Sequence, residues 1–102
     1  MDMIIDETLR MYPIATRVDR VVTTNEYTYK NIRMNKGDGF TVAIWTLHHD
    51  PEIYPDPYTF NPYRFTEEEK KKRDNCAYLP FGAGPRHCIG NDLKFKKYIY
   101  KY

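Results

Sequence analysis

The residues best suited to do chemistry lie together at residues 81–90, which read Phe-Gly-Ala-Gly-Pro-Arg-His-Cys-Ile-Gly. Cys88 offers a thiolate, which can act as a nucleophile or bind a metal. A phosphate-binding loop would need a Lys and a Ser or Thr at its end, and neither stands there. A zinc site would need closer ligand pairs than Cys76, His87 and Cys88 provide. An ordinary buried cysteine would leave Arg86 and the glycines unexplained, so the stretch predicts a loop built around the Cys88 sulfur.

These ten residues resemble the haem-binding loop of cytochromes P450, because they match its pattern F-x-x-G-x-R-x-C-x-G at all five fixed positions. At an average residue frequency of ~5%, such a match arises by chance in about one of a few million windows. The resemblance implies that Cys88 is the axial ligand of the iron of haem b. A thiolate in that position pushes electron density onto the metal and favours cleavage of an O–O bond.

The resemblance also gives roles to the neighbours of Cys88. Phe81 would shield the sulfur from water, and the planar guanidinium of Arg86 would pair with a haem propionate. Gly84 and Gly90 would let the backbone bend tightly and approach the porphyrin where a Cβ would clash. Backbone N–H groups after Cys88 are expected to turn toward the sulfur, because such bonds tune the strength of a metal ligand.

A second group of charged residues is expected to support this loop. Glu7 and Arg10 stand three residues apart in a predicted helix, a spacing that is ordinary on helix surfaces. In cytochromes P450, however, such a pair is joined by an arginine from a later meander, and the stretch around Arg64 resembles that meander. The resemblance therefore implies that Glu7 lies between two guanidinium groups and locks the proline-rich segment in place, a structural role.

Residues 13–20, Pro-Ile-Ala-Thr-Arg-Val-Asp-Arg, resemble a segment of microsomal cytochromes P450 that oxidise drugs and other foreign compounds. The resemblance implies that Arg20 pairs with a haem propionate. It also implies that Ile14, Ala15 and Thr16 face the substrate. The alternative for these three side chains is a place in the core of a strand.

The elements that must position these residues follow from hydrophobic periodicity and turn signals. Residues 1–12 predict an amphipathic helix that Pro13 ends, with an apolar face made by Met1, Ile4, Ile5, Leu9 and Tyr12. Strands are predicted at residues 14–24, 27–33 and 40–45, the last after a Lys-Gly-Asp-Gly turn signal.

The second half of the chain is predicted to be mostly irregular. A short helix is expected near residues 46–49, where both histidines, His48 and His49, are interpreted as structural. The four prolines of residues 50–65 predict an irregular segment, and the charge run of residues 67–73 predicts a solvated loop or a short helix.

Together these features predict an α+β fragment of the mainly-α cytochrome P450 fold, with an N-terminal helix, short β-strands, a proline-rich meander and a haem-binding Cys loop. Residues 1–90 would form this partial domain. Residues 91–102 depart from the family pattern and consist largely of Lys, Tyr, Phe, Ile and Asn, which A/T-rich codons encode. This divergent tail is therefore expected to come from intron read-through or a frameshift.

The implied function is that of a haem-thiolate monooxygenase, which hydroxylates lipophilic small molecules with O2 and with electrons from NADPH. NADPH-cytochrome P450 reductase would be its partner. The endoplasmic reticulum membrane would be its location, through an anchor outside these residues. The alternative is a truncated, non-catalytic fragment that cannot enclose haem by itself. The net charge of +2 predicts no nucleic-acid partner.

Overall fold

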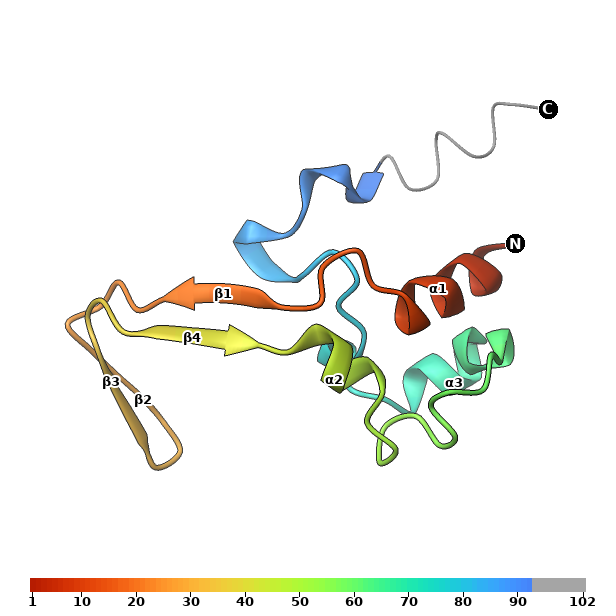
Figure 1. Cartoon of the computed structure of the whole chain (residues 1–102), viewed down its shortest axis with the longest axis horizontal. Helices are drawn as coiled ribbons and strands as arrows, with labels where there is room; N and C mark the ends of the chain where they lie inside the picture. Colours follow the sequence, from red (N-terminus) through yellow and green to blue (C-terminus); the bar gives the residue numbers. More distant parts are fainter. Residues whose placement is uncertain (93–102) are drawn as a thin grey trace.

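The computed structural model describes residues 1–92, so the predicted divergent tail of residues 91–102 lies almost wholly outside the described part. Short helices and short antiparallel strands follow one another along the chain, which is a small α+β arrangement. Figure 1 shows that the labelled helices gather at one end and that the strands extend away from them. Among the described helices, none is long and apolar enough to cross a membrane.

Helix α1 spans Asp2–Met11 and ends just before Pro13, as predicted. The face that it buries is the charged one, because Glu7 and Arg10 have no exposed surface. The predicted apolar face is only partly buried: Ile5 and Leu9 are half-buried, whereas Ile4 is 55% exposed. Burial of the charged face is tolerated because its polar atoms find partners in other segments, which offsets the loss of hydration.

The first predicted strand is shorter in the structure, and the second is two strands. Strand β1 spans Val18–Val21. Strands β2 (Glu26–Tyr29) and β3 (Ile32–Asn35) form an antiparallel hairpin, so the predicted single strand over residues 27–33 was wrong. The turn between them falls on Lys30, whose φ of 52° suits a two-residue hairpin turn.

The third predicted strand ends early and gives way to a helix. Strand β4 spans Gly39–Val42 and pairs antiparallel with β1 from Val18↔Val42 to Val21↔Gly39. Helix α2 spans Ile44–His48, close to the short helix expected there. The pairing of β1 with β4 brings the end of α1 and the start of α2 to the same end of the ribbon (Figure 1).

Residues 50–65, the meander, are irregular except for a 3₁₀ turn at Pro62–Phe65. Helix α3 follows at Glu67–Lys71 and buries none of its side chains, so of the predicted solvated loop or short helix the structure has the short helix. Thr66 caps it, because its hydroxyl oxygen accepts a hydrogen bond from the Glu69 N–H at 3.4 Å. Two further 3₁₀ turns, Asn75–Ala77 and Gly84–Arg86, precede Cys88, and a third, Ile89–Asp92, follows it.

The apolar core lies between α1, α2 and the meander, and Tyr54 and Phe65 are its largest apolar members. The hydroxyl of Tyr54 donates a hydrogen bond to the backbone oxygen of Ala77 at 3.0 Å. The guanidinium carbon of Arg73 lies 4.8 Å from the Tyr54 ring centroid and 5.1 Å from that of Phe65. The core is therefore small and aromatic, and cations stack on its edge.

Candidate functional site

Glu7 is the centre of a buried ion-pair network, defined here as Glu7, Arg10 and Arg64. Its carboxylate accepts hydrogen bonds from Arg10 Nε at 2.7 Å and Arg10 Nη2 at 2.9 Å. It also accepts one from the backbone N–H of Asn61 at 2.9 Å. Arg64 Nε lies 3.7 Å from Glu7 Oε1, close enough for an ion pair and too far for a hydrogen bond. One carboxylate thus faces two guanidinium groups. The resemblance implied this arrangement, whereas the Glu-x-x-Arg spacing alone did not require it.

The guanidinium groups of this network also hold backbone atoms. Arg10 Nη1 donates to the backbone oxygen of His48 at 2.8 Å, which ties α1 to the end of α2. Arg64 Nη2 donates to the backbone oxygen of Asp56 at 2.9 Å, within the meander. The side chain of Arg64 is 11% exposed, whereas those of Glu7 and Arg10 are completely buried. The network therefore joins α1, α2 and the meander in a largely buried place, with only Arg64 reaching the surface.

The chain that enters the Cys loop (residues 80–90) is held by α1 and by α2. The Tyr78 hydroxyl lies 3.0 Å from the backbone oxygen and 3.1 Å from Oδ1 of Asp6 on α1. Burial, followed by the negative charge of Asp6, raises the pKa of Tyr78 far above its ordinary value. The Leu79 N–H donates to Nε2 of His48 at 3.0 Å. Both anchors lie immediately before the loop.

Within the Cys loop, backbone bonds bring the chain back on itself around Cys88. The Cys88 N–H donates to the backbone oxygen of Phe81 at 2.8 Å. The Gly90 N–H points at Cys88 Sγ across 3.4 Å. A Cβ on Gly90 would stand 3.4 Å from the same sulfur, and Gly84 has a φ of +77°, which L side chains rarely adopt. The cysteine side chain itself is exposed.

A hollow of about 350 Å³ lies beside the first part of this loop. It is lined by Tyr78, by His87 and by the chain from Pro80 to Gly84. Within residues 1–92 no cluster of three or more His, Cys, Asp or Glu side chains could hold a metal ion. A metal that binds at Cys88 can take its other ligands from a prosthetic group. The exposed thiol and its N–H partner fit a group such as haem, whose porphyrin supplies those ligands.

The other residues singled out in the sequence are more dispersed. Arg86 is exposed in the 3₁₀ turn of the loop, and Arg20 is half-buried on β1, where its Nη1 donates to the backbone oxygen of Asp19 at 2.9 Å. The three side chains expected to face substrate are exposed and lie in the irregular chain between α1 and β1: Ile14, Ala15 and Thr16. A place in a strand core is wrong for them, because β1 begins only at Val18.

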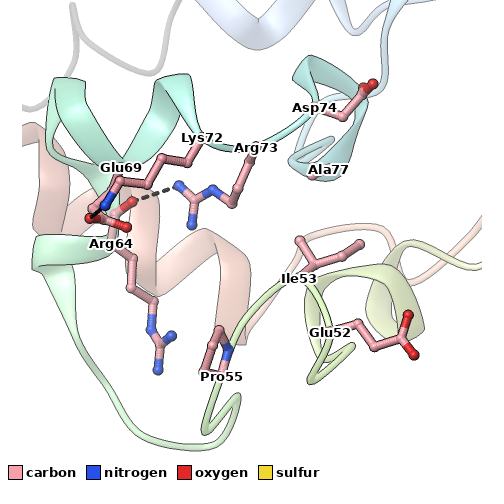
Figure 2. A pocket seen from close by; sticks show the side chains of 9 residues that line it. All are labelled: Glu52, Ile53, Pro55, Arg64, Glu69, Lys72, Arg73, Asp74 and Ala77. Carbon is pink, nitrogen blue, oxygen red and sulfur yellow. Dashed lines mark hydrogen bonds and ion pairs between the residues drawn. The ribbon is translucent and has the colours of Figure 1, made fainter.

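A larger cavity of about 430 Å³ lies between the meander and residues 69–77, and no residue of the Cys loop lines it. Figure 2 shows Arg64 reaching toward the segment of Pro55, with Arg73 beside it. Arg73 Nη2 donates to the backbone oxygen of Arg64 at 2.6 Å, so the Arg73 guanidinium group has a structural role. Because carboxylates such as Glu52 and Asp74 line the same cavity, its charge selects no class of ligand.

Sequence analysis missed the two anchors before the loop. Asp6 and Tyr78 are 72 residues apart, and His48 and Leu79 are 31 residues apart. No local pattern links residues at such separations. His48 and His49 are buried, in agreement with their structural interpretation. That interpretation did not indicate which distant backbone group either of them holds.

Comparison with known proteins places the chain in a family. The family model of cytochrome P450 matches residues 1–93. Probable cytochrome P450 6a19 of Drosophila melanogaster is 47% identical over 92 residues, 88% of this chain and 18% of that protein. Cytochrome P450 3A18 of Rattus norvegicus is 47% identical over 90 residues, with the same shares. Cytochrome P450 3A27 of Oncorhynchus mykiss is 47% identical over 90 residues, 88% of this chain and 17% of that protein. The chain thus spans less than a fifth of the length of these relatives, and it belongs to the cytochrome P450 family.

Proposed function

We propose that these residues are the haem-binding end of a haem-thiolate monooxygenase and that Cys88 is the axial ligand of a haem b iron. One observation carries the proposal: the Gly90 N–H points at an exposed Cys88 sulfur across 3.4 Å. An N–H donor beside a thiolate adjusts its donor strength, and an exposed sulfur leaves room for iron to approach. When bound, haem supplies the activation of O2, which a thiolate ligand favours.

The residues around Cys88 have distinct parts in this proposal. Arg86 and Arg20 hold the haem propionates, because a guanidinium group pairs well with a carboxylate. Phe81 shields the sulfur, and its backbone oxygen already fixes the Cys88 N–H. Gly84 and Gly90 would keep the backbone free of side chains beside a bound porphyrin. Gly84 also takes the positive φ that the loop requires.

The remaining assignments concern a protein of the relatives' length. We propose that it hydroxylates lipophilic small molecules, which Ile14, Ala15 and Thr16 contact from their exposed positions before β1. Its electrons come from NADPH through NADPH-cytochrome P450 reductase, and it resides in the endoplasmic reticulum membrane. The names of the relatives, all of them cytochromes P450, support this assignment.

The 102 residues alone are proposed to be non-catalytic, because they leave the haem ligand open to solvent. Cys88 is exposed, and the side chain of Ile89 is 95% exposed. A haem bound at this surface would have its sulfur ligand in contact with water rather than in a closed, apolar site. We expect no monooxygenase turnover from the isolated chain.

A chimera tests the role of Cys88. Residues 1–90 replace the matching segment of cytochrome P450 3A18 of Rattus norvegicus, which is 47% identical over 90 residues. The reduced, carbon-monoxide-bound difference spectrum of the chimera is expected to show the Soret band of a thiolate-ligated haem. Cys88→Ser should abolish that band. Cys76→Ser, the matched control at the other exposed cysteine, should retain it.

Two results would contradict the proposal. A thiolate-type band that survives Cys88→Ser would exclude Cys88 as the ligand. A chimera that folds and takes up no haem would show that residues 1–90 do not form a haem site. For the isolated 102-residue chain the same spectrum should lack the thiolate-type band, and its appearance would overturn the assignment as a non-catalytic fragment.

A further inference from the structure

We propose that His48 is a positioning residue for Cys88, because its ring holds the start of the Cys loop and its backbone holds the buried ion-pair network. The inference rests on the proposed role of Cys88 as haem ligand. In this inference α2 connects the buried ion-pair network to the Cys loop and holds the loop in position.

His48 contacts the segment before the Cys loop through its ring and the buried ion-pair network through its backbone. Its side chain has no exposed surface. Its Nε2 accepts the Leu79 N–H at 3.0 Å, and its ring stacks on that of Tyr78 with centroids 5.4 Å apart. On the other side, its backbone oxygen accepts the hydrogen bond from Arg10 Nη1 at 2.8 Å. A single residue therefore contacts both the network and the segment that leads into the loop.

A short series of backbone bonds continues from Leu79 to the cysteine. The Leu79 oxygen accepts the Gly82 N–H at 3.1 Å, which closes the turn at the start of the loop. Phe81, inside that turn, offers its oxygen to the Cys88 N–H at 2.8 Å. A displacement of Leu79 therefore moves the turn and, with it, the acceptor that orients Cys88. The hydrogen bond that the Leu79 N–H donates to His48 fixes the first member of this series.

The chemistry of the ring indicates that His48 serves to accept the Leu79 N–H at Nε2. Accepting at Nε2 requires a neutral imidazole with its proton on Nδ1. Among the described residues, Nδ1 of His48 is buried and has no hydrogen-bond partner. An unpaired buried donor is unfavourable, and a phenylalanine would fill the same space beside Tyr78 without it. Packing alone therefore gives no reason for a histidine here, whereas the Leu79 N–H does.

The groups around His48 keep the ring neutral. Burial, then the charge of Arg10 on α1 and the adjacent His49, lower its pKa to about 4, although the backbone of Arg10 acts on the ring in the opposite direction. Tyr78 faces the ring from the loop side, with Asp6 beyond its hydroxyl. At neutral pH the acceptor is therefore available, and protonation of Nε2 would remove it.

Hydrogen exchange of the 102-residue chain at micromolar concentration, read by mass spectrometry with fragmentation to single amides, tests the inference. His48→Phe keeps a ring against Tyr78 and removes the acceptor. It should make the amides of Leu79 and Cys88 exchange about tenfold faster, the loss of one buried hydrogen bond. His48→Gln, which retains an acceptor, should keep both rates within about threefold of wild type.

The neighbouring histidine offers a matched control. His49 is also buried, but its ring contacts the backbone oxygen of Trp45 at 2.8 Å rather than the loop. His49→Phe should leave the exchange of Leu79 and Cys88 unchanged. The Arg10 amide on α1 reports global opening, and it should keep its protection in His48→Phe.

Every other outcome counts for or against the inference. Faster exchange at Leu79 with unchanged exchange at Cys88 would mean that the series of bonds does not reach the cysteine. If His48→Phe also loses protection at Arg10, His48→Gln decides: protection retained at both loop amides supports the acceptor role, and protection lost at either refutes it. No haem is needed for these measurements, so a failure to bind haem and a failure of His48 are separate results.

The chimera provides a spectroscopic readout that general loss of stability would not mimic. His48→Phe is expected to weaken the thiolate-type Soret band at unchanged haem content, and His48→Gln to restore it. An undiminished band in His48→Phe would refute the positioning role and leave Cys88 as the ligand.

Discussion

Replacing Glu7 with Gln removes the negative charge that faces the guanidinium groups of Arg10 and Arg64. The glutamine has the same size, and its oxygen can still accept the Asn61 N–H, which lies 2.9 Å from Oε1 in the native chain. Its NH2 group, however, would face Arg10, whose Nε and Nη2 are themselves donors, at 2.7 and 2.9 Å from the carboxylate. The substitution therefore creates a donor–donor contact as well as two unpaired positive charges.

The expected loss is large because the site is dry. Glu7 and Arg10 have no exposed side-chain surface. Removing one member of such a buried pair costs about 3–5 kcal/mol. A chain of this length has a total unfolding free energy of about 5–15 kcal/mol. With a urea m-value of about 1.5 kcal/mol/M, the midpoint should fall by about 2–3 M.

Urea unfolding followed by the fluorescence of Trp45 measures this loss. Trp45 is the single tryptophan and stacks on His49 with ring centroids 4.2 Å apart, so its emission reports the fold around α2. The matched control is Glu67→Gln on α3, where an 82% exposed carboxylate pairs with Lys70 at 3.1 Å. An exposed pair contributes about 0–1 kcal/mol, so the control midpoint should move by less than about 0.7 M.

Equal midpoint shifts in Glu7→Gln and Glu67→Gln would refute the reasoning. They would mean that the Glu7 carboxylate is hydrated in solution and that the buried ion-pair network does not hold α1 to the meander. A large shift confined to Glu7→Gln, with an unchanged m-value, would support the geometry described above.

Two other substitutions and a pH series give further tests. Tyr54→Phe leaves the buried backbone oxygen of Ala77 without its 3.0 Å partner, so the unfolding free energy should fall by about 1–2 kcal/mol. Tyr58→Phe, at a 69% exposed position, should leave it unchanged, and equal effects would contradict the role of the Tyr54 hydroxyl. The pKa of His48 is lowered from 6.5 to about 4 by folding, so the unfolded chain binds the proton first. Stability from this group is therefore complete above pH 6.5 and declines as pH falls toward 4, by up to about 3 kcal/mol. Urea midpoints of wild type and His48→Gln should diverge over that range, and parallel curves would contradict the burial of a neutral ring.

Several elements were predictable because their signals are local. Helix α1 ends where Pro13 excludes a helical residue before it, and α3 is short because its charges find no buried surface. The hairpin of β2 and β3 was missed because its turn at Lys30 contains no glycine. Cross-strand pairing from Glu26↔Asn35 to Tyr29↔Ile32 holds Lys30 at a positive φ that its own sequence does not favour.

The spacing of residues 81–90 was enough to predict a tight loop around the Cys88 sulfur. Its glycines, arginine and cysteine contact residues only a few positions away in the chain. The structure then decided which residues support that loop. Only the packing of α1 against α2 and the meander buried the charged face of α1, placed Arg64 beside Glu7 and brought His48 to Leu79. These contacts join residues that are 31 to 57 positions apart, and the energy of each depends on the exclusion of water by surfaces that no short stretch of sequence contains.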